Sequence, residues 1–592
     1  MISLSALKFA YLSGQKSPRV FITEHLLSLR ARQANNPDPA WIYLATEEQI
    51  NAQLLKIEAS QHSELPLLGI PFAIKDNIDV KDWVTTAACP DFAHLAHETA
   101  VAVQKLMDAG AILIGKTNLD QFATGLVGTR SPYGAVPNTF NPEYVSGGSS
   151  SGSASVMARG LVCFSLGTDT AGSGRVPAGF NNIVGMKPTP GLVSIEGVLP
   201  ACKTLDCLSI FAATAADASL VLSVMQSSTD DLAREPQFHP PRPAVSTFPA
   251  KLRLGIPRSP QFMGNTEYEY AYKSAIASAR SMGASIVEID FSHLDRIAGL
   301  LYNGPWVAER YVTIESLLAS HPEAIDPTVR RVIGLAEKFS AADTFKALYE
   351  LKQLAITTRG IWSECDALLV PTAPTHPTLA EVAAEPVLRN SELGTYTNFV
   401  NLLGMSAISV PAGLTGSNMP FGVTFIAPGG YDQALLKLGA HWQSMQTLAP
   451  GAPNNANTME LEQIQIAVVG AHLQGMPLHQ QLVDRNCRLI ARTQTSPFYQ
   501  LYALANTSPP KPGLVRLAAG GQAIELEVYA MPAQHVGSFL SLIPGPLGLG
   551  SIELANGSWV KGFICEPWAI EHAQNISHLG GWRAYISSLA RG

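Results

Sequence analysis

The 592-residue sequence is poor in charged residues and has no block of basic side chains. Only 15% of its residues are charged, and the net charge is −7, so no electrostatic surface for nucleic acid is indicated. No uninterrupted apolar stretch is long enough to span a bilayer. The N-terminal segment MISLSALKFAYLSGQKSPR also lacks the basic region and apolar core of a signal peptide. We therefore expect a cytoplasmic protein that binds neither nucleic acid nor a membrane.

Cysteine is also scarce, and its spacing excludes two common uses. The seven cysteines are scattered and form no CxxC pair, so neither a disulfide framework nor a zinc site is indicated. Reduced thiols are the simpler interpretation, and they fit a cytosolic protein. Because no constellation of metal-ligating residues is visible either, we expect no metal and no other cofactor.

The chain does contain enough apolar residues, 46% of the total, for a large core, and its length predicts two or more domains. The small, polar, Pro-containing segment LAPGAPNNANTM marks the best boundary. We expect a first domain at 1–447 with a helical N-terminal arm, a linker at 448–459 and a second domain at 460–592. The second has many short strands between Pro and Gly turns, which is typical of a small, mainly β, barrel-like domain.

The first domain alternates between patterns of helices and strands. Residues 1 to about 60 have apolar side chains at helical spacing, and a polar cap at Thr46 begins one of the helices. Strands are predicted at 111–118 and at the apolar run 161–166, and a helix is predicted at 267–282. This alternation predicts an α/β sheet covered by helices.

The stretch 146–189 is rich in Gly and Ser but is not typical of a linker, because a predicted strand lies between its two serine clusters. Serine hydroxyls can act as nucleophile or proton relay, and Gly lets backbone N–H groups approach a ligand. In the sequence Thr168-Asp-Thr-Ala-Gly-Ser173-Gly174, the position after a strand can expose a serine beside an anion-binding nest of N–H groups. These features predict an active site for acyl transfer.

Such a nucleophile needs a base, and no histidine of the core region stands in a suggestive context: His94, His97 and His239 lie in loop-like or helical surroundings. Lys75 directly follows an apolar strand. It is either a strand-end lysine that reaches solvent or a buried amine that is paired or deprotonated. The second alternative fits a Ser-Ser-Lys relay with the two serine clusters.

The segments GGSSSGSASVMARG, LGTDTAGSGRVPAGFNNIVGMKPT, GIPFAIKDNIDV and KTNLDQFATG strongly resemble the amidase signature family, over roughly residues 20–445. The resemblance implies a mixed sheet covered by helices and a Ser-Ser-Lys triad. It assigns Ser173 as the nucleophile and Lys75 as the ultimate base. Ser149 becomes the bridging serine, which in the family usually sits on a cis peptide bond.

The same resemblance assigns residues around the triad. The oxyanion loop is Thr170, Ala171, Gly172 and Ser173, and the supporting positions are Ser150, Asp169 and Arg175. The chain departs from the family pattern where Ser151 replaces a Gly and where Ala171 precedes Gly172-Ser173. Both are small-for-small changes that we expect to leave catalysis intact.

The segment LYNGPWVAERY resembles the part of allophanate hydrolases that presents a tyrosine and an arginine to the substrate, here Tyr302 and Arg310. Eight residues apart, they would share one face of a continuous helix, unless Gly304-Pro305 interrupts it. An arginine fork binds a carboxylate such as that of allophanate bidentately; the alternative for Arg310 is a surface ion pair. Gly125 lies in the loop expected to face the substrate.

The tail IAVVGAHLQGMPLHQQL, LEVYAMPAQHVGSFL, IPGPLGLGSIELANGSWVKGFICE and GGWRAY closely resembles the C-terminal domain of allophanate hydrolases. The resemblance implies a fold similar to gamma-glutamyl cyclotransferase and a link to decarboxylation of N-carboxycarbamate. His472, which ends a predicted apolar strand, is the candidate acid/base residue of this second site, or else a structural histidine. Glu566 and His479 are weaker candidates.

Together the resemblances predict a two-step hydrolase that converts allophanate to ammonia and carbon dioxide, in the use of nitrogen from urea or from cyanurate. Three alternatives are a broad-specificity amidase with an accessory tail, an amidotransferase subunit that acts in a complex, and a non-catalytic binding module. No biotin-attachment or carboxylase segment is visible, so a separate urea carboxylase is the expected functional partner. The helical N-terminal arm makes a homodimer the expected assembly.

Overall fold

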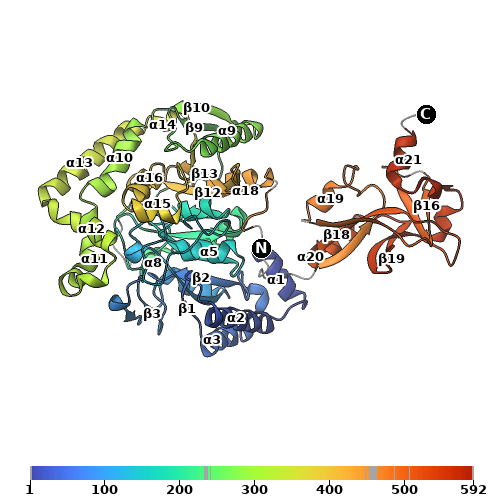
Figure 1. Ribbon diagram of the computed structural model, residues 1–592, viewed down its shortest axis with the longest axis horizontal. Coiled ribbons are helices and arrows are strands. Elements are labelled where there is room, and N and C mark those ends of the chain that lie inside the picture. The colour runs from blue at the N-terminus through green and yellow to red at the C-terminus, as the bar shows by residue number, and fades with distance from the viewer. Residues whose placement is uncertain are drawn as a thin grey trace. The chain divides into compact units, whose positions relative to one another are not determined.

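The computed structural model describes residues 3–232, 238–239, 242–446, 448–452, 463–485, 487–505, 507 and 509–589 (Figure 1). The chain divides into two compact units, Met1–Met459 and Glu460–Gly592. Most of the predicted linker, 453–459, lies outside the described residues.

The first unit is built on an 11-stranded sheet that contains both parallel and antiparallel pairs, as the mixed-sheet prediction requires. In spatial order the strands are β1 (Trp41–Leu44), β5 (Ile112–Thr117), β2 (Pro71–Lys75), β6 (Phe164–Asp169), β8 (Cys207–Ala212), β7 (Val184–Lys187), β12 (Ser406–Leu414), β13 (Pro420–Ala427), β11 (Ala367–Pro371), β9 (Arg253–Pro257) and β10 (Ser285–Ile289). A separate two-stranded antiparallel sheet consists of β3 (Val84–Thr85) and β4 (His94–Leu95).

Helices surround this sheet (Figure 1). They are α1 (Leu4–Leu12), α2 (Pro18–Asn35), α3 (Glu47–Glu58), α4 (Val101–Asp108), α5 (Ser151–Ala158), α6 (Val176–Phe180), α7 (Ala215–Met225), α8 (Thr229–Leu232), α9 (Thr266–Ser281), α10 (Ser292–Asn303), α11 (Val307–Ser320), α12 (Pro327–Ile333), α13 (Ala341–Thr358), α14 (Ile361–Glu364), α15 (Leu379–Ala384), α16 (Leu388–Leu393), α17 (Asn398–Leu402) and α18 (Asp432–Ser444).

The N-terminal helices α1 to α3 confirm most of the prediction for residues 1–60. Thr46 caps α3 in a reciprocal capping box with Gln49, which satisfies backbone donors at the start of that helix. The four-residue strand β1 was not predicted. It is too short for an alternating pattern to stand out, and it forms because its antiparallel partner β5 offers an edge.

The centre of the sheet determines where the candidate site lies. Strands β2 and β6 are parallel neighbours, with Ile74 opposite Leu166, so their carboxyl ends, at Lys75 and Asp169, meet at one edge of the sheet. Both strands are buried along their whole length, as expected for strands covered on both faces. The strand predicted at 161–166 instead begins at Phe164 and extends to Asp169.

Strand β8, which was not predicted, lies beside β6 and runs antiparallel to it, with Asp169 opposite Cys207. The residues that follow β6 therefore face those that precede β8. This neighbour brings a second segment of chain against the serine loop.

The second unit has a five-stranded sheet and a three-stranded sheet, a smaller strand-rich unit as predicted. The first contains β15 (Arg488–Gln494), β18 (Glu525–Pro532), β14 (Gln463–Val468), β20 (Trp559–Cys565) and β19 (Leu547–Glu553); the second contains β17 (Pro512–Arg516), β16 (Tyr499–Ala503) and β21 (Gln574–Asn575). Its helices are α19 (Gln480–Val483), α20 (Ala533–Leu540) and α21 (Trp582–Leu589). Apolar side chains of β14, β18 and β20 meet in one buried cluster.

Candidate active site

Lys75, Ser149 and Ser173 form one continuous chain of hydrogen bonds at the end of β2 and β6. Lys75 Nζ donates to Ser149 Oγ at 2.8 Å, and Ser149 Oγ donates to Ser173 Oγ at 3.0 Å. The peptide bond between Gly148 and Ser149 is cis. Hydroxyl hydrogens can rotate, so this chain can also carry a proton from Ser173 toward Lys75.

Lys75 does not reach solvent, because its exposed fraction is 0%. Its Nζ also donates to Thr168 Oγ1 at 2.7 Å, and no carboxylate of the described residues forms an ion pair with it. Burial lowers the pKa of Lys75 to about 7, against the opposing charges of the buried Asp206, Asp120 and Asp169. A large part of the amine is therefore neutral near physiological pH and can accept a proton.

The loop before Ser173 presents free backbone donors. No acceptor in the described part of the chain receives a hydrogen bond from the N–H of Ala171 or of Ser173. The N–H of Gly172 is engaged, because it donates to Asp169 Oδ1 at 2.9 Å. Of the predicted oxyanion loop, Thr170, Ala171 and Ser173 therefore keep a backbone N–H with no acceptor among the described residues, and Gly172 does not.

Gly172 leaves space for a neighbouring side chain in the same loop. Its φ is +130°, and a Cβ there would lie 2.5 Å from Thr397 Oγ1. Thr397 in turn donates to the carbonyl of Ala171 at 2.6 Å. The absence of a side chain at Gly172 thus lets Thr397 hold the loop from one side.

Asp169 and Arg175 form a buried bidentate ion pair beneath the loop, with both nitrogen–oxygen distances at 2.9 Å. Burial alone would raise the pKa of Asp169, but the Arg175 guanidinium outweighs it and holds that pKa below its usual value. The Asp169 carboxylate also accepts the N–H of Gly174 at 3.0 Å. Nearby, Ser150 Oγ donates to the carbonyl of Thr168 at 3.2 Å. These supporting residues fix the backbone on both sides of Ser173.

Tyr302 and Arg310 lie on different helices, because the chain breaks between α10 and α11 at Gly304-Pro305. They nevertheless meet: Arg310 Nη2 donates to the Tyr302 hydroxyl at 3.3 Å, and the guanidinium stacks over the Tyr302 ring. Of the two alternatives, an interruption at Gly304-Pro305 is therefore the one that the structure has, and the two side chains meet across it.

Arg310 is not a surface ion pair, because only 2% of it is exposed. Its Nη1 donates to Ala123 O at 3.2 Å and Thr124 Oγ1 at 3.1 Å, while Nε has no partner among the described residues. Its charge is close enough to oppose protonation of Lys75. A buried cation with a free donor beside the relay is suited to bind an anionic group of a substrate.

Gly125 packs against a carboxylate that sequence reasoning missed. A Cβ at Gly125 would lie 2.4 Å from Asp120 Oδ2. Asp120 accepts the four consecutive N–H groups of residues 127–130, at 2.9–3.2 Å. Asp120 thus folds the loop between β5 and the first serine cluster, and Gly125 leaves room for it.

Two more residues of the site, Thr168 and Asp206, carried no signal in the sequence. Thr168 contacts Lys75 from β6, and Asp206 accepts a hydrogen bond from the hydroxyl of Thr170. Thr168 could have been found only by pairing β6 with β2, and Asp206 only by pairing β8 with β6, because nothing in their local sequence marks them.

His472 lies in the second unit, four residues beyond β14 rather than at its end. It is 8% exposed, its Nε2 contacts Gln481 Oε1 at 2.9 Å, and its ring packs on Phe539 and Phe563. Burial lowers the pKa of His472, and the positive charges of Lys511, His479 and Arg485 lower it further. His472 is therefore neutral near pH 7.

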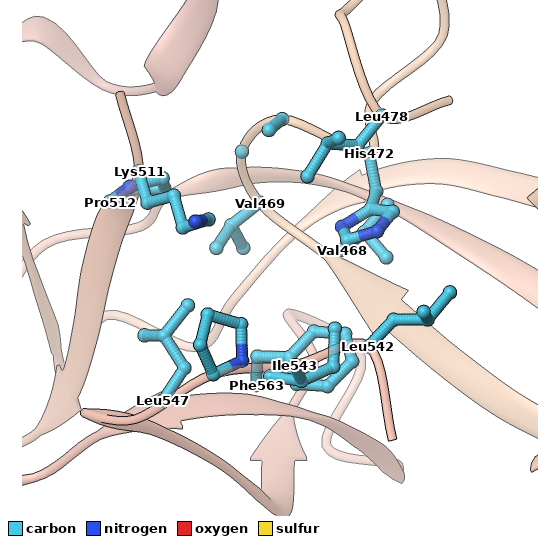
Figure 2. A pocket seen from close by; sticks show the side chains of 13 residues that line it. Val468, Val469, His472, Leu478, Lys511, Pro512, Leu542, Ile543, Leu547 and Phe563 are labelled. Atoms are coloured by element: carbon cyan, nitrogen blue, oxygen red, sulfur yellow. The ribbon is translucent and has the colours of Figure 1, made fainter. Parts of the chain in front are cut away.

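A small cavity of ≈ 40 Å³ opens beside His472. Figure 2 shows Lys511 and His472 on two sides of it, with Leu547, Ile543 and Phe563 across from them. No acidic residue of the described chain lines it, and since one water needs about 10–15 Å³, it fits a ligand of only a few non-hydrogen atoms. An apolar pocket with one cation suits a small anion.

The weaker candidates do not line this cavity. Glu566 is exposed and accepts a hydrogen bond from Trp568. His479 contacts the backbone carbonyl of His472 at 3.3 Å, so its contact with the pocket is indirect. Of the three, His472 alone presents its ring to the cavity.

The described residues include neither a membrane-spanning helix nor a cluster of metal-ligating side chains. None of the helices there has the length and apolar character to cross a membrane. Within the same residues, no group of three or more His, Cys, Asp or Glu side chains could hold a metal ion.

Two family models match the sequence: residues 22–436 match the Amidase family, and residues 464–587 match the allophanate hydrolase C-terminal domain. The urea amidolyase of Saccharomyces cerevisiae is 44% identical over 582 residues, which cover 94% of this chain but 31% of that protein. The chain thus spans about a third of the length of the urea amidolyases it matches. A glutamyl-tRNA(Gln) amidotransferase subunit of Deinococcus deserti is 30% identical over 493 residues, covering 76% of this chain and 97% of that protein.

The structure is similar to that of Kluyveromyces lactis allophanate hydrolase. The TM-score is 0.72 at 43% identity, and the match covers 99% of each chain. By sequence and by fold, the chain therefore belongs to the Amidase family and carries an allophanate hydrolase C-terminal domain.

Proposed function

We propose that the protein is an allophanate hydrolase. The observation that carries the proposal is the buried Lys75–Ser149–Ser173 chain beside the free Nε of Arg310. The first half supplies amide hydrolysis, and the second supplies a cation for the carboxylate of allophanate. The likeness to Kluyveromyces lactis allophanate hydrolase over nearly the whole chain supports the same substrate.

In the first step, the Oγ of Ser173 attacks the terminal amide carbon of allophanate. As it does so, Ser173 gives its proton to Ser149, and Ser149 gives its own proton to neutral Lys75. The N–H groups of Ala171 and Ser173 donate to the oxyanion. Each such donor typically raises kcat by roughly 100- to 1000-fold. The proton returns to the leaving ammonia, and water then releases N-carboxycarbamate from the acyl-enzyme. Arg310 and Tyr302 hold the distal carboxylate throughout.

In the second step, the pocket of the C-terminal unit assists the loss of carbon dioxide from N-carboxycarbamate, which leaves carbamate after its nitrogen gains a proton. Lys511 attracts the dianion, and the neutral His472 passes a proton from water to the nitrogen. The apolar lining favours the step because the carboxylate charge disperses as carbon dioxide leaves. Carbamate then decomposes to ammonia and carbon dioxide.

The test is ammonia released per allophanate by the full chain, with Ser173→Ala beside it. We expect the parent to release two ammonia and the variant none. Ser278→Ala, which removes an exposed hydroxyl on α9, is the matched control and should behave as the parent. Near-parent activity in Ser173→Ala would exclude the assignment.

An amidotransferase subunit is the second candidate, favoured by the 30% identity to the tRNA-dependent relative over 76% of the chain. That relative matches over 97% of its own length, and its match leaves about a quarter of this chain unaccounted for. A broad-specificity amidase is the third. Steady-state kinetics with allophanate, glutamine and a simple amide separate the three, since only an allophanate hydrolase prefers allophanate strongly.

The setting is proposed on weaker grounds. Seven free cysteines, six of them buried, support a reducing cytoplasm. The urea amidolyase relatives support a link to urea breakdown through a urea carboxylase; supply from cyanurate is the alternative. We expect a homodimer, and light scattering on the purified chain measures it.

A further inference from the structure

Asp206 is a buried carboxylate that no step above uses. It immediately precedes β8, and the pairing of Asp169 with Cys207 places it against Thr170, the first residue after β6. Only 6% of it is exposed. Its position is therefore a consequence of strand register, next to the loop that carries the nucleophile.

The Asp206 carboxylate is held by three donors. Oδ1 accepts the hydroxyl of Thr170, and Oδ2 accepts the N–H groups of Ala201 at 2.7 Å and Cys202 at 3.2 Å. None of the described Lys, Arg or His side chains forms an ion pair with it. A carboxylate fixed in this way acts as a rigid anchor for the Thr170 side chain.

Thr170 adjoins Ala171, whose backbone N–H has no acceptor among the described residues. The far side of the loop is pinned by Thr397 and the underside by Asp169. The Thr170–Asp206 hydrogen bond closes the remaining side. Since oxyanion stabilisation depends on donors fixed before the reaction, this contact bears directly on rate.

Asp206 also acts through space. Among the charges near Lys75, that of Asp206 raises the pKa of Lys75 most, followed by Asp120 and Asp169, whereas Arg310 lowers it. Burial raises the pKa of Asp206 itself to about 6, with Thr170 and Arg310 opposing. At pH 7 and above Asp206 is therefore mostly ionised, and its negative charge makes Lys75 a stronger base.

Building on the function proposed above, we propose that Asp206 is a positioning residue for amide hydrolysis. Through Thr170 it fixes the segment that carries the N–H donors, and through space it stabilises the protonated form of Lys75. The two effects are separable, because one depends on a hydrogen bond and the other on a charge.

Asp206→Asn separates them. The asparagine oxygen can still accept from Ala201 and Cys202, and its amide can donate to the Thr170 oxygen, so the anchor remains while the charge is lost. Without that charge Lys75 loses its proton more readily. We expect the rise of kcat/KM with pH to move about one unit lower, with less than about a 10-fold loss at pH 8.

Thr170→Val removes the anchor. It also removes a hydrogen bond that lowers the pKa of Asp206, so the variant is compared with the parent at pH 9, where ionisation of the carboxylate is most complete. We expect kcat at that pH to fall roughly 10- to 100-fold, as a fraction of one oxyanion donor. Thr170→Ser keeps a hydroxyl and should restore most of the rate. Asp206→Ser is a second charge-free variant should Asp206→Asn not fold.

The readout is first-step ammonia release from allophanate between pH 6 and 9 by the full chain, with Ser173→Ala as the blank. An unshifted midpoint in folded Asp206→Asn and Asp206→Ser overturns the charge effect. Equal kcat in Thr170→Val, Thr170→Ser and the parent overturns the anchor. Activity in the Ser173→Ala blank instead refutes the proposed function, so the two failures are distinguishable.

Discussion

Replacing Arg310 by glutamine tests whether the first site selects its substrate by a carboxylate. The guanidinium is almost fully buried, and its Nη1 and Nη2 are held by Ala123, Thr124 and Tyr302. Only Nε is free among the described residues. A carboxylate bound there exchanges water for a buried, oriented cation, and glutamine removes that cation while keeping a hydrogen-bonding side chain.

The magnitude follows from the burial. Removing one partner of a buried, hydrogen-bonded charge pair costs about 2–5 kcal/mol, and each 1.4 kcal/mol is about tenfold. We therefore expect kcat/KM for allophanate to fall roughly 30- to 4,000-fold in Arg310→Gln. Biuret carries a neutral carboxamide in place of the carboxylate. In Arg310→Gln, kcat/KM for biuret should therefore fall only by the worth of an ordinary hydrogen bond, about 2- to 12-fold.

The assay compares initial rates of ammonia release from allophanate and from biuret. Any distortion left by losing the contacts to Ala123 and Thr124 affects both substrates, so the ratio of the two losses isolates the charge. Arg296→Gln is the control: it lies on α10, is 65% exposed and pairs with Glu350, a contact worth at most about 1 kcal/mol. Equal losses for both substrates in Arg310→Gln would show that the carboxylate is bound elsewhere.

Four further outcomes are expected. In the parent, kcat/KM for the first step should rise as pH increases through about 7, because Lys75 must lose its proton; a rate independent of pH from 6 to 9 would contradict a lysine base. His472→Gln should leave the first ammonia unchanged and slow the appearance of the second, seen as N-carboxycarbamate persisting in carbon-13 NMR spectra. Gly172→Ala should lower both the melting temperature and kcat, since φ is +130° and the new Cβ meets Thr397. Asp169→Asn breaks a buried ion pair and should cost about 3–5 kcal/mol in a denaturation experiment, where a loss below about 1 kcal/mol would refute the assigned role.

The sequence indicates the members of the relay and, through the family resemblance, the supporting Asp169 and Arg175, but it does not indicate Asp206. Lys75 and the two serine clusters stand out locally, because a lysine after an apolar strand and a Gly/Ser stretch around a strand are both unusual. Asp206 does not stand out: its neighbours Leu205 and Cys207 are ordinary apolar residues, and its role arises only when β8 pairs with β6. Register between distant strands is not written in any local pattern.

Arg310 illustrates the converse, where the sequence indicates the residue but not the geometry. Helical spacing places Tyr302 and Arg310 on one face of a helix only if Gly304-Pro305 leaves that helix intact. The interruption is real, yet the side chains still touch. A contact across a helix break depends on how both helices pack, which spacing alone does not reveal.

On the proposed function, the two sites handle the same chemical group in opposite ways, and the residues that surround each site fit that difference. In the first unit the carboxylate of the substrate must survive the reaction, and Arg310 offers it a fixed, fully buried cation with directional donors. In the second unit the carboxylate must leave as carbon dioxide, so tight charge pairing would stabilise the ground state and slow the step. A partly exposed Lys511 at the edge of an apolar pocket attracts the anion without enclosing it.

On this reasoning Lys511→Arg, which would bind the carboxylate more tightly through its planar guanidinium, should lower KM for the second step and lower its kcat as well. A rise in both KM and kcat of this variant, measured from the decay of N-carboxycarbamate, would show that Lys511 acts during the loss of carbon dioxide rather than before it.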